Sequence, residues 1–87
     1  MFTLFFYGKY LLDSGVKNQA LEVAKLNQQR HPDELFYTHL ALARACTATG
    51  DKPTAITAWE LALQHVPDNR KASIPQFQAA LKKLKEG

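Results

Sequence analysis

The sequence predicts an all-α fold, a solenoid of helical hairpins with two repeats and a closing helix. The first observation is a self-similarity with a period of 35 residues, which is typical of stacked helix pairs. The second is that apolar residues recur at helical spacing between glycine and Pro-Asp breaks. The third is that no run alternates with a period of two, as strands would. The positions that recur in register are Gly15, Ala20, Leu26, Pro32 and Asp33, which return as Gly50, Ala55, Leu61, Pro67 and Asp68.

Composition is that of one small globular domain. The chain has 87 residues, of which 46% are hydrophobic and 22% are charged, and a formal net charge of +3. Much of the positive charge lies near the C-terminus, where we expect a solvated helix face rather than a nucleic-acid surface. No apolar run is long enough to cross a membrane. The single cysteine, Cys46, cannot form an internal disulfide, so a cytoplasmic location is the expectation for the chain as given.

The first hairpin is predicted from helix-ending signals. One helix is expected over residues 2–13, where Gly15 can take the left-handed conformation that ends a helix. A second is expected over residues 17–30, and Pro32 ends it because proline disfavours helical backbone in the preceding residue. Asp33 is then placed to cap the next helix.

The second hairpin repeats these signals. A helix is expected over residues 34–49, ended by Gly50. The following helix begins at Asp51, a strong N-cap residue, with Pro53 tolerated in its first turn. It ends at the Pro67 break. Alanines are expected where the paired helices approach closely, and Tyr7, Leu42, Ile56 and Trp59 are expected to fill the space between the pairs.

A fifth helix over residues 73–86 is predicted to cap the stack rather than to begin a third repeat. Ser73 and Gln76 have the spacing of a capping box. After them comes one narrow apolar stripe, and the remaining surface is polar. A terminal helix with one apolar and one charged face suits the end of a repeat array. The stripe consists of Ile74, Phe77, Leu81 and Leu84.

These patterns resemble the tetratricopeptide repeat. Residues 36–69 resemble it closely and residues 1–34 more loosely, so the chain is expected to be a single domain of two such repeats and a capping helix. The first repeat departs from the pattern at Val16 and Asn27, where the family usually has aspartate and alanine. The second repeat carries the resemblance through Leu42-Ala43, Gly50-Asp51, Ala55-Ile56, Trp59, Ala62-Leu63 and Pro67.

A longer resemblance is to the tetratricopeptide tail that closes some bacterial multidomain proteins. It rests on the run from Tyr7 to Asp33 and on the last residues, 81–87. Such a tail follows a catalytic or uncharacterised domain. This resemblance implies an accessory segment, whereas a free-standing chain would be a binding module.

The resemblance also implies a groove lined by the first helix of each repeat. Lys9 and Arg44 occupy the same position in successive repeats, so both cations are expected to point into it. Such a groove would suit an acidic or C-terminal peptide. The alternative is that these are solvated basic residues with no ligand. The groove residues expected are Phe5, Lys9, Leu12, Tyr37, Leu40 and Arg44.

The N-terminal helix carries more aromatic residues than one buried face can hold. Some must therefore face outward, where they indicate an interface with an upstream domain or a second copy, or an aggregation-prone surface. Because repeat arrays generally need about three repeats, we expect a homodimer. The interface residues expected are Phe2, Phe5, Phe6 and Tyr10.

Catalytic and metal chemistry find no support in the sequence. The three histidines, His31, His39 and His65, have none of the usual zinc-ligand spacings. No serine lies in a glycine-flanked elbow motif and no glycine-rich loop could hold a phosphate. The sequence therefore predicts a non-catalytic protein–protein interaction module with no cofactor or metal. The alternative is an accessory or dimerisation tail of a larger bacterial enzyme.

Overall fold

The structure, a computed structural model, describes residues 2–86. These residues form five α-helices and one 3-10 helix, with no strand among them. Met1 and Gly87, the ends of the predicted 1–87 domain, lie outside the described part. The elements in chain order are α1 (Phe2–Asp13), α2 (Lys17–Arg30), α3 (Tyr37–Thr49), α4 (Lys52–Gln64), η1 (Asp68–Ser73) and α5 (Ile74–Glu86).

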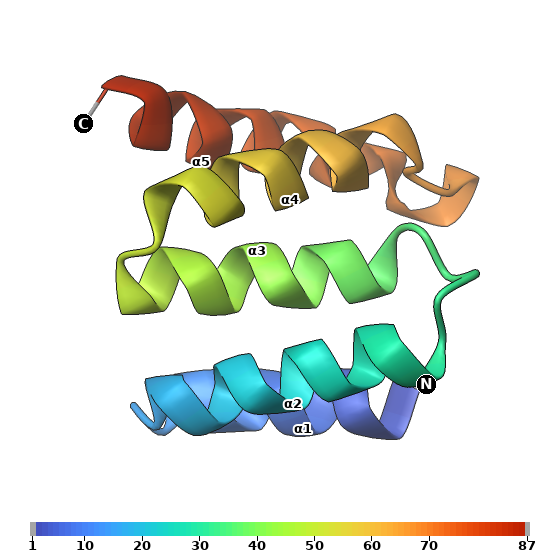
Figure 1. The fold of residues 1–87 in the computed structure, drawn as a ribbon. Helices are drawn as coiled ribbons and strands as arrows, with labels where there is room; N and C mark the ends of the chain where they lie inside the picture. Colours follow the sequence, from blue (N-terminus) through green and yellow to red (C-terminus); the bar gives the residue numbers. More distant parts are fainter. Residues whose placement is uncertain (1, 87) are drawn as a thin grey trace.

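The helices stack as antiparallel hairpins in the order of the chain (Figure 1). α2 packs against both α1 and α3, and α4 packs against both α3 and α5. α1 also reaches past α2 to contact α3. The predicted all-α fold of helical hairpins with a fifth, C-terminal helix is confirmed.

Local signals place most of the helix ends where the sequence predicts them. Gly15 and Gly50 follow the first helix of each hairpin with φ angles of +80° and +88°, a region that costs residues with a Cβ atom and not glycine. Asp51 caps α4 through its side chain, which accepts a hydrogen bond from the Thr54 backbone N–H. These ends are set by short-range chemistry that the sequence displays directly.

The start of α3 differs from the prediction. The helix begins at Tyr37 rather than at Glu34. The Glu34 carboxylate accepts a hydrogen bond from the Thr38 backbone N–H at 3.0 Å, and the Thr38 hydroxyl donates to the Glu34 carbonyl oxygen. Glu34 therefore supports the first turn from outside the helix, which is the role that the sequence predicted for Asp33.

The core lies mainly between α3, α4 and α5. Small residues are buried where helices meet, and aromatic rings fill the gaps: the Trp59 and Phe77 rings lie 5.7 Å apart, and those of Phe36 and Phe77 lie 5.9 Å apart. Tyr7, which we expected to pack between the helices, is 49% exposed. The clustered core residues are Phe5, Phe36, Leu40, Ala43, Cys46, Ala55, Ala58, Trp59, Ala62 and Phe77.

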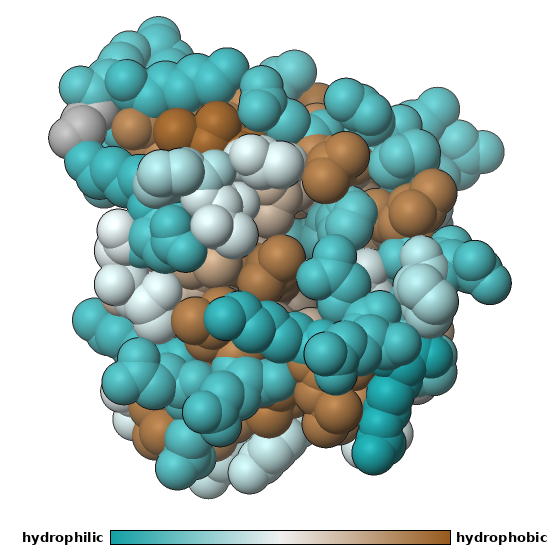
Figure 2. Space-filling model, in the orientation of Figure 1, coloured by the Kyte–Doolittle hydropathy of each residue, from teal (hydrophilic) through white to brown (hydrophobic). Residues whose placement is uncertain are grey.

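α5 covers the end of the stack, as predicted for a closing helix. Phe77 is buried, and the lysines of the outer face are exposed. Figure 2 shows hydrophilic residues along the outer edge of α5 and apolar residues beneath it, towards α4. The capping box predicted at Ser73 and Gln76 is not formed, because Ser73 ends η1 and that helix runs directly into α5.

Helix length and hydropathy decide whether a helix could cross a membrane. Within residues 2–86, none of the helices is both long enough and apolar enough to span a bilayer.

Candidate functional site

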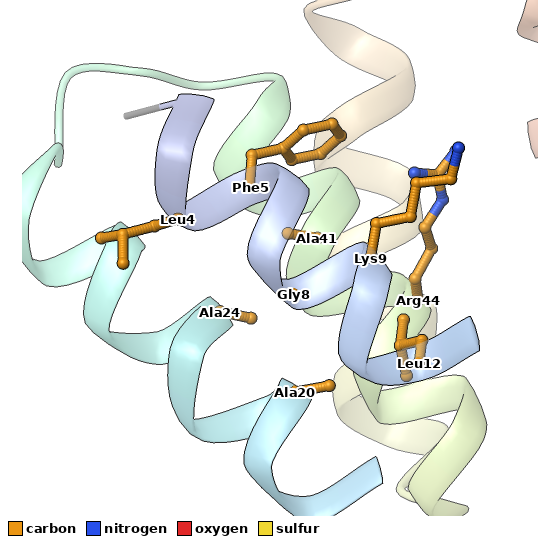
Figure 3. A pocket seen from close by; sticks show the side chains of 9 residues that line it. All are labelled: Leu4, Phe5, Gly8, Lys9, Leu12, Ala20, Ala24, Ala41 and Arg44. Atoms are coloured by element: carbon orange, nitrogen blue, oxygen red, sulfur yellow. The ribbon is translucent and has the colours of Figure 1, made fainter. Parts of the chain in front are cut away.

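A small pocket lies where α1 meets α2 and α3 (Figure 3). Its volume is about 10 Å³, which is room for about one water molecule. It is therefore a surface depression that could take the tip of a side chain, and not a cavity that could enclose a cofactor. Its lining residues are Leu4, Phe5, Gly8, Lys9, Leu12, Ala20, Ala24, Ala41 and Arg44.

Four of the six predicted groove residues are brought together here. Lys9 and Leu12 come from α1 with Phe5, and Arg44 comes from α3. Small residues surround them: alanines of α2 and α3 let these helices approach α1 closely enough for side chains of α1 and α3 to share one depression. In Figure 3 the nitrogen ends of the two cations extend in the same direction.

The two remaining groove residues, Leu40 and Tyr37, do not line this pocket. Leu40 is 0% exposed and belongs to the core, so the structure does not present it to a partner. Tyr37, three residues earlier in α3, is half-buried, with its ring 5.3 Å from that of Phe5. Phe5 is itself buried and forms the floor of the site.

The charge at this site is positive, and none of the ion pairs within residues 2–86 involves it. No carboxylate of the described residues lies within ion-pair distance of Lys9 or Arg44. Burial lowers the pKa of the Arg44 guanidinium, the positive charge of Arg70 lowers it further, and Asp13 raises it. Arg44 remains a cation, because the pKa of arginine lies far above neutrality.

Both arginines lie over aromatic rings. The Arg44 Cζ atom is 5.9 Å from the centroid of the Phe5 ring, and the Arg70 Cζ atom is 5.6 Å from that of Tyr37. Since Phe5 and Tyr37 contact each other edge to face, the two rings form one floor beneath two guanidinium groups. Contacts of this kind restrain arginine side chains that would otherwise be mobile.

Arg70 is the residue that sequence reasoning missed. It lies in η1, which no pattern predicted, and the helical periodicity that located Arg44 does not extend to it. Its Nε–H is buried and has no hydrogen-bond partner among the described residues. The signal that the sequence offered was its place between the Pro67 break and the closing helix, where connecting segments often carry binding residues.

The predicted interface aromatics divide between core and surface. Phe2, Phe6 and Tyr10 are exposed by half or more, whereas Phe5 is buried. The Phe2 and Phe6 rings stack 6.3 Å apart, and Phe2 contacts Tyr37 at 5.0 Å. The exposed aromatic surface, Phe2, Phe6 and Tyr10, therefore adjoins the Phe5–Tyr37 floor of the basic site.

The histidines and the cysteine form no reactive cluster. Among residues 2–86, no three histidine, cysteine, aspartate or glutamate side chains come together as metal ligands would. The Gln28 side-chain Nε2 and the His39 Nδ1 are hydrogen-bonded at a distance of 3.3 Å. Cys46 is buried, and burial raises the pKa of its thiol, which disfavours the reactive thiolate.

Comparison with known proteins adds no assignment. No family model, curated protein or solved structure matches the chain.

Proposed function

We propose that the chain is a non-catalytic protein–protein interaction module of the tetratricopeptide type that binds an acidic peptide across α1 and α3. The observation that supports this best is that Lys9 and Arg44, from equivalent positions of the two hairpins, line one pocket and have no ion-pair partner among residues 2–86. A peptide carboxylate would supply the missing negative charge, and charge-assisted hydrogen bonds are among the stronger polar contacts.

The stacked hairpin architecture supports the family proposal in a second way. α1 and α3 contact each other although α2 separates them in the chain, so the first helix of each hairpin contributes to one continuous face. Extended peptides and helices commonly bind such faces through a few anchor side chains.

The test is binding of a hexaglutamate peptide with blocked ends, measured by fluorescence polarisation. Replacing both Lys9 and Arg44 by alanine should weaken binding about a hundredfold, because each lost charge-assisted contact is worth about tenfold. The matched control replaces Lys82 and Lys83, two exposed lysines of α5, and so removes the same charge elsewhere. Equal weakening in both double variants would refute a specific site.

A second candidate function is an accessory or dimerisation tail of a larger enzyme. Its supporting observation is the exposed aromatic surface on α1, where Phe6 is 60% exposed and Tyr10 is 64% exposed. Clustered exposed aromatic side chains are typical of interfaces. On this proposal two copies would pair through α1 and lengthen the helical stack.

A further inference from the structure

The exposed aromatic surface of α1 occupies positions that the equivalent helix of the second hairpin, α3, turns towards the first hairpin. Phe6 corresponds to Ala41 in the 35-residue repeat, and Tyr10 corresponds to Ala45. Ala41 lines the small pocket together with residues of α1 and α2. Ala45, one turn further along α3, is 1% exposed, whereas Tyr10 is 64% exposed. The exposed aromatic surface is therefore a helix-packing face that nothing within residues 2–86 covers.

The side chains on this face are too large for a helix to pack on α1 as α2 packs on α3. Where α3 has alanine, which allows close approach, α1 has an aromatic ring. Phe2, Phe6 and Tyr10 follow one another at intervals of four residues, so they form a ridge along the surface of the helix. A partner must therefore offer grooves into which such a ridge fits.

A second copy of α1 meets this requirement. Two helices whose ridges both run through every fourth residue interlock when their axes cross at about 50°. In a two-fold symmetric pair the same patch serves both copies. With the axis at Phe6 and the helices antiparallel, the two Phe6 rings meet, and Phe2 of each copy lies opposite Tyr10 of the other.

The charges of α1 favour the antiparallel arrangement over the parallel one. Asp13, the last residue of α1, lies seven residues after Phe6 and so on the same face. The first turn of α1 has no acidic residue, although a carboxylate stabilises the positive end of a helix. An antiparallel pair brings Asp13 of each copy to the first turn of the other. A parallel pair would instead bring the two Asp13 carboxylates together, which is unfavourable.

The opposite end of the stack does not suit the aromatic ridge. α1 and α2 lie at one end and α5 lies at the other (Figure 1). Exposed lysines cover the outer face of α5, and packing aromatic rings on them would remove ammonium groups from water without a carboxylate partner. We therefore expect two copies to join through α1 on both sides, which closes the assembly at a dimer.

The exposed area is enough for a weak, specific dimer. Tyr7 adds to the surface, because it is half-exposed and stacks on Tyr10 at 6.5 Å. An aromatic side chain buries about 200 Å² when fully covered, so covering the exposed halves of these rings in two copies removes about 800 Å² from water. Specific interfaces bury about 1,200–2,000 Å² in total. The aromatic side chains thus supply about half of a small interface, and we expect association in the micromolar range.

We propose that two copies of the chain form an antiparallel, two-fold symmetric dimer in which α1 packs against α1 with Phe6 on the axis. This inference rests on the second candidate function, the dimerisation tail, and gives that function a partner surface and a geometry. It also accounts for the aromatic residues that stand at positions where α3 has alanine.

The first test places charges on the proposed axis. Phe6→Lys and Phe6→Glu should each raise the dimer dissociation constant at least about tenfold, because like charges then meet across the axis. An equimolar mixture of the two variants should recover the dimer, because the charges then pair. Sedimentation equilibrium measures each sample. A mixture that associates no better than either variant alone would overturn the two-fold axis at Phe6.

The matched controls are Leu35→Lys and Leu35→Glu, at an exposed apolar residue outside α1. These variants should associate as the unmodified chain does, whether alone or mixed. Controls that lose the dimer as the Phe6 variants do would overturn the proposed interface, because the effect would then follow from net charge.

A second measurement uses the unmodified chain, so it does not depend on the folding of a variant. Isotope-filtered nuclear Overhauser spectra of a mixture of ¹³C-labelled and unlabelled chains detect contacts between copies. We expect contacts between the two Phe6 rings and between Phe2 of one copy and Tyr10 of the other. Contacts between the Phe2 rings of the two copies, or contacts of α1 with α5, would overturn the antiparallel pair.

The outcomes separate this inference from the function on which it rests. An unmodified chain that dimerises, with a dissociation constant that neither Phe6 variant changes, would leave the dimerisation tail standing and remove the α1 pair. An unmodified chain that stays monomeric at tens of micromolar would refute both.

Discussion

The indole Nε1–H of Trp59 on α4 donates a hydrogen bond to the Thr47 Oγ1 on α3, at 3.1 Å. The same hydroxyl donates to the Ala43 carbonyl oxygen one turn earlier, at 2.7 Å. One side chain thus joins the two helices of the second hairpin and satisfies the polar atom of the largest core residue. Buried tryptophan N–H groups usually need such a partner.

Thr47→Val should lower the free energy of unfolding by about 1–2 kcal/mol, because valine keeps the shape of threonine and removes the acceptor of the Trp59 N–H. The measurement is urea unfolding followed by tryptophan fluorescence. The control is Thr57→Val, since Thr57 makes only a bond to the Pro53 carbonyl of its own helix. Equal losses in both variants would show that the contact between helices contributes nothing.

Asn27→Ala should raise the free energy of unfolding by about 1 kcal/mol. Asn27 is 0% exposed, and neither polar atom of its side-chain amide has a hydrogen-bond partner within residues 2–86. Its removal therefore relieves a desolvation cost that no hydrogen bond offsets. Asn18→Ala, at an exposed position of the same helix, measures the gain from helix propensity. Thermal unfolding measures both variants. The prediction is contradicted if Asn27→Ala gains no more stability than Asn18→Ala.

Folding stability should decrease on mild acidification because of His39. Burial lowers the pKa of its imidazole, as does the nearby charge of His65, while Glu34 raises it. The folded chain thus binds this proton more weakly than the unfolded chain does. The contribution of His39 is therefore fully present above the ordinary histidine pKa of about 6.5 and is lost as the pH falls through it towards the folded value.

His39→Gln should reduce the slope of unfolding free energy against pH between about pH 7.5 and 5, the region in which histidines titrate. Urea unfolding at a series of pH values measures it, with His31→Gln as the control at the C-cap of α2. An unchanged slope in the His39 variant would assign the pH dependence to other groups.

The dimerisation proposal predicts a concentration-dependent mass. Replacing Phe2 and Phe6 by serine should raise the dimer dissociation constant at least about tenfold, because large aromatic residues dominate interface energetics. Sedimentation equilibrium measures this, and Leu35→Ser is the control, an exposed apolar residue outside α1. A wild-type chain that stays monomeric at tens of micromolar would end the proposal.

The candidate site was only partly predictable. The equivalent positions of Lys9 and Arg44 follow from the repeat, and the structure places both beside one pocket. Periodicity did not separate the residues on adjoining helix faces, so Leu40 was expected in the groove and is buried, while Tyr7 was expected inside and is half-exposed. A rotation of a few tens of degrees about a helix axis decides such cases, and only packing against neighbours sets it.

What the sequence determined by itself is the list of helices and most of their ends. Gly15, Gly50 and Asp51 act through backbone conformation and hydrogen bonds within a few residues, so their effects can be predicted without the rest of the chain. Tertiary structure decided what lies far apart along the chain and close together in space. Arg44 and Arg70 share one aromatic floor because α4 returns the chain antiparallel to α3 and η1 carries it on to α5. No local pattern carries that information, since it arises from helix packing.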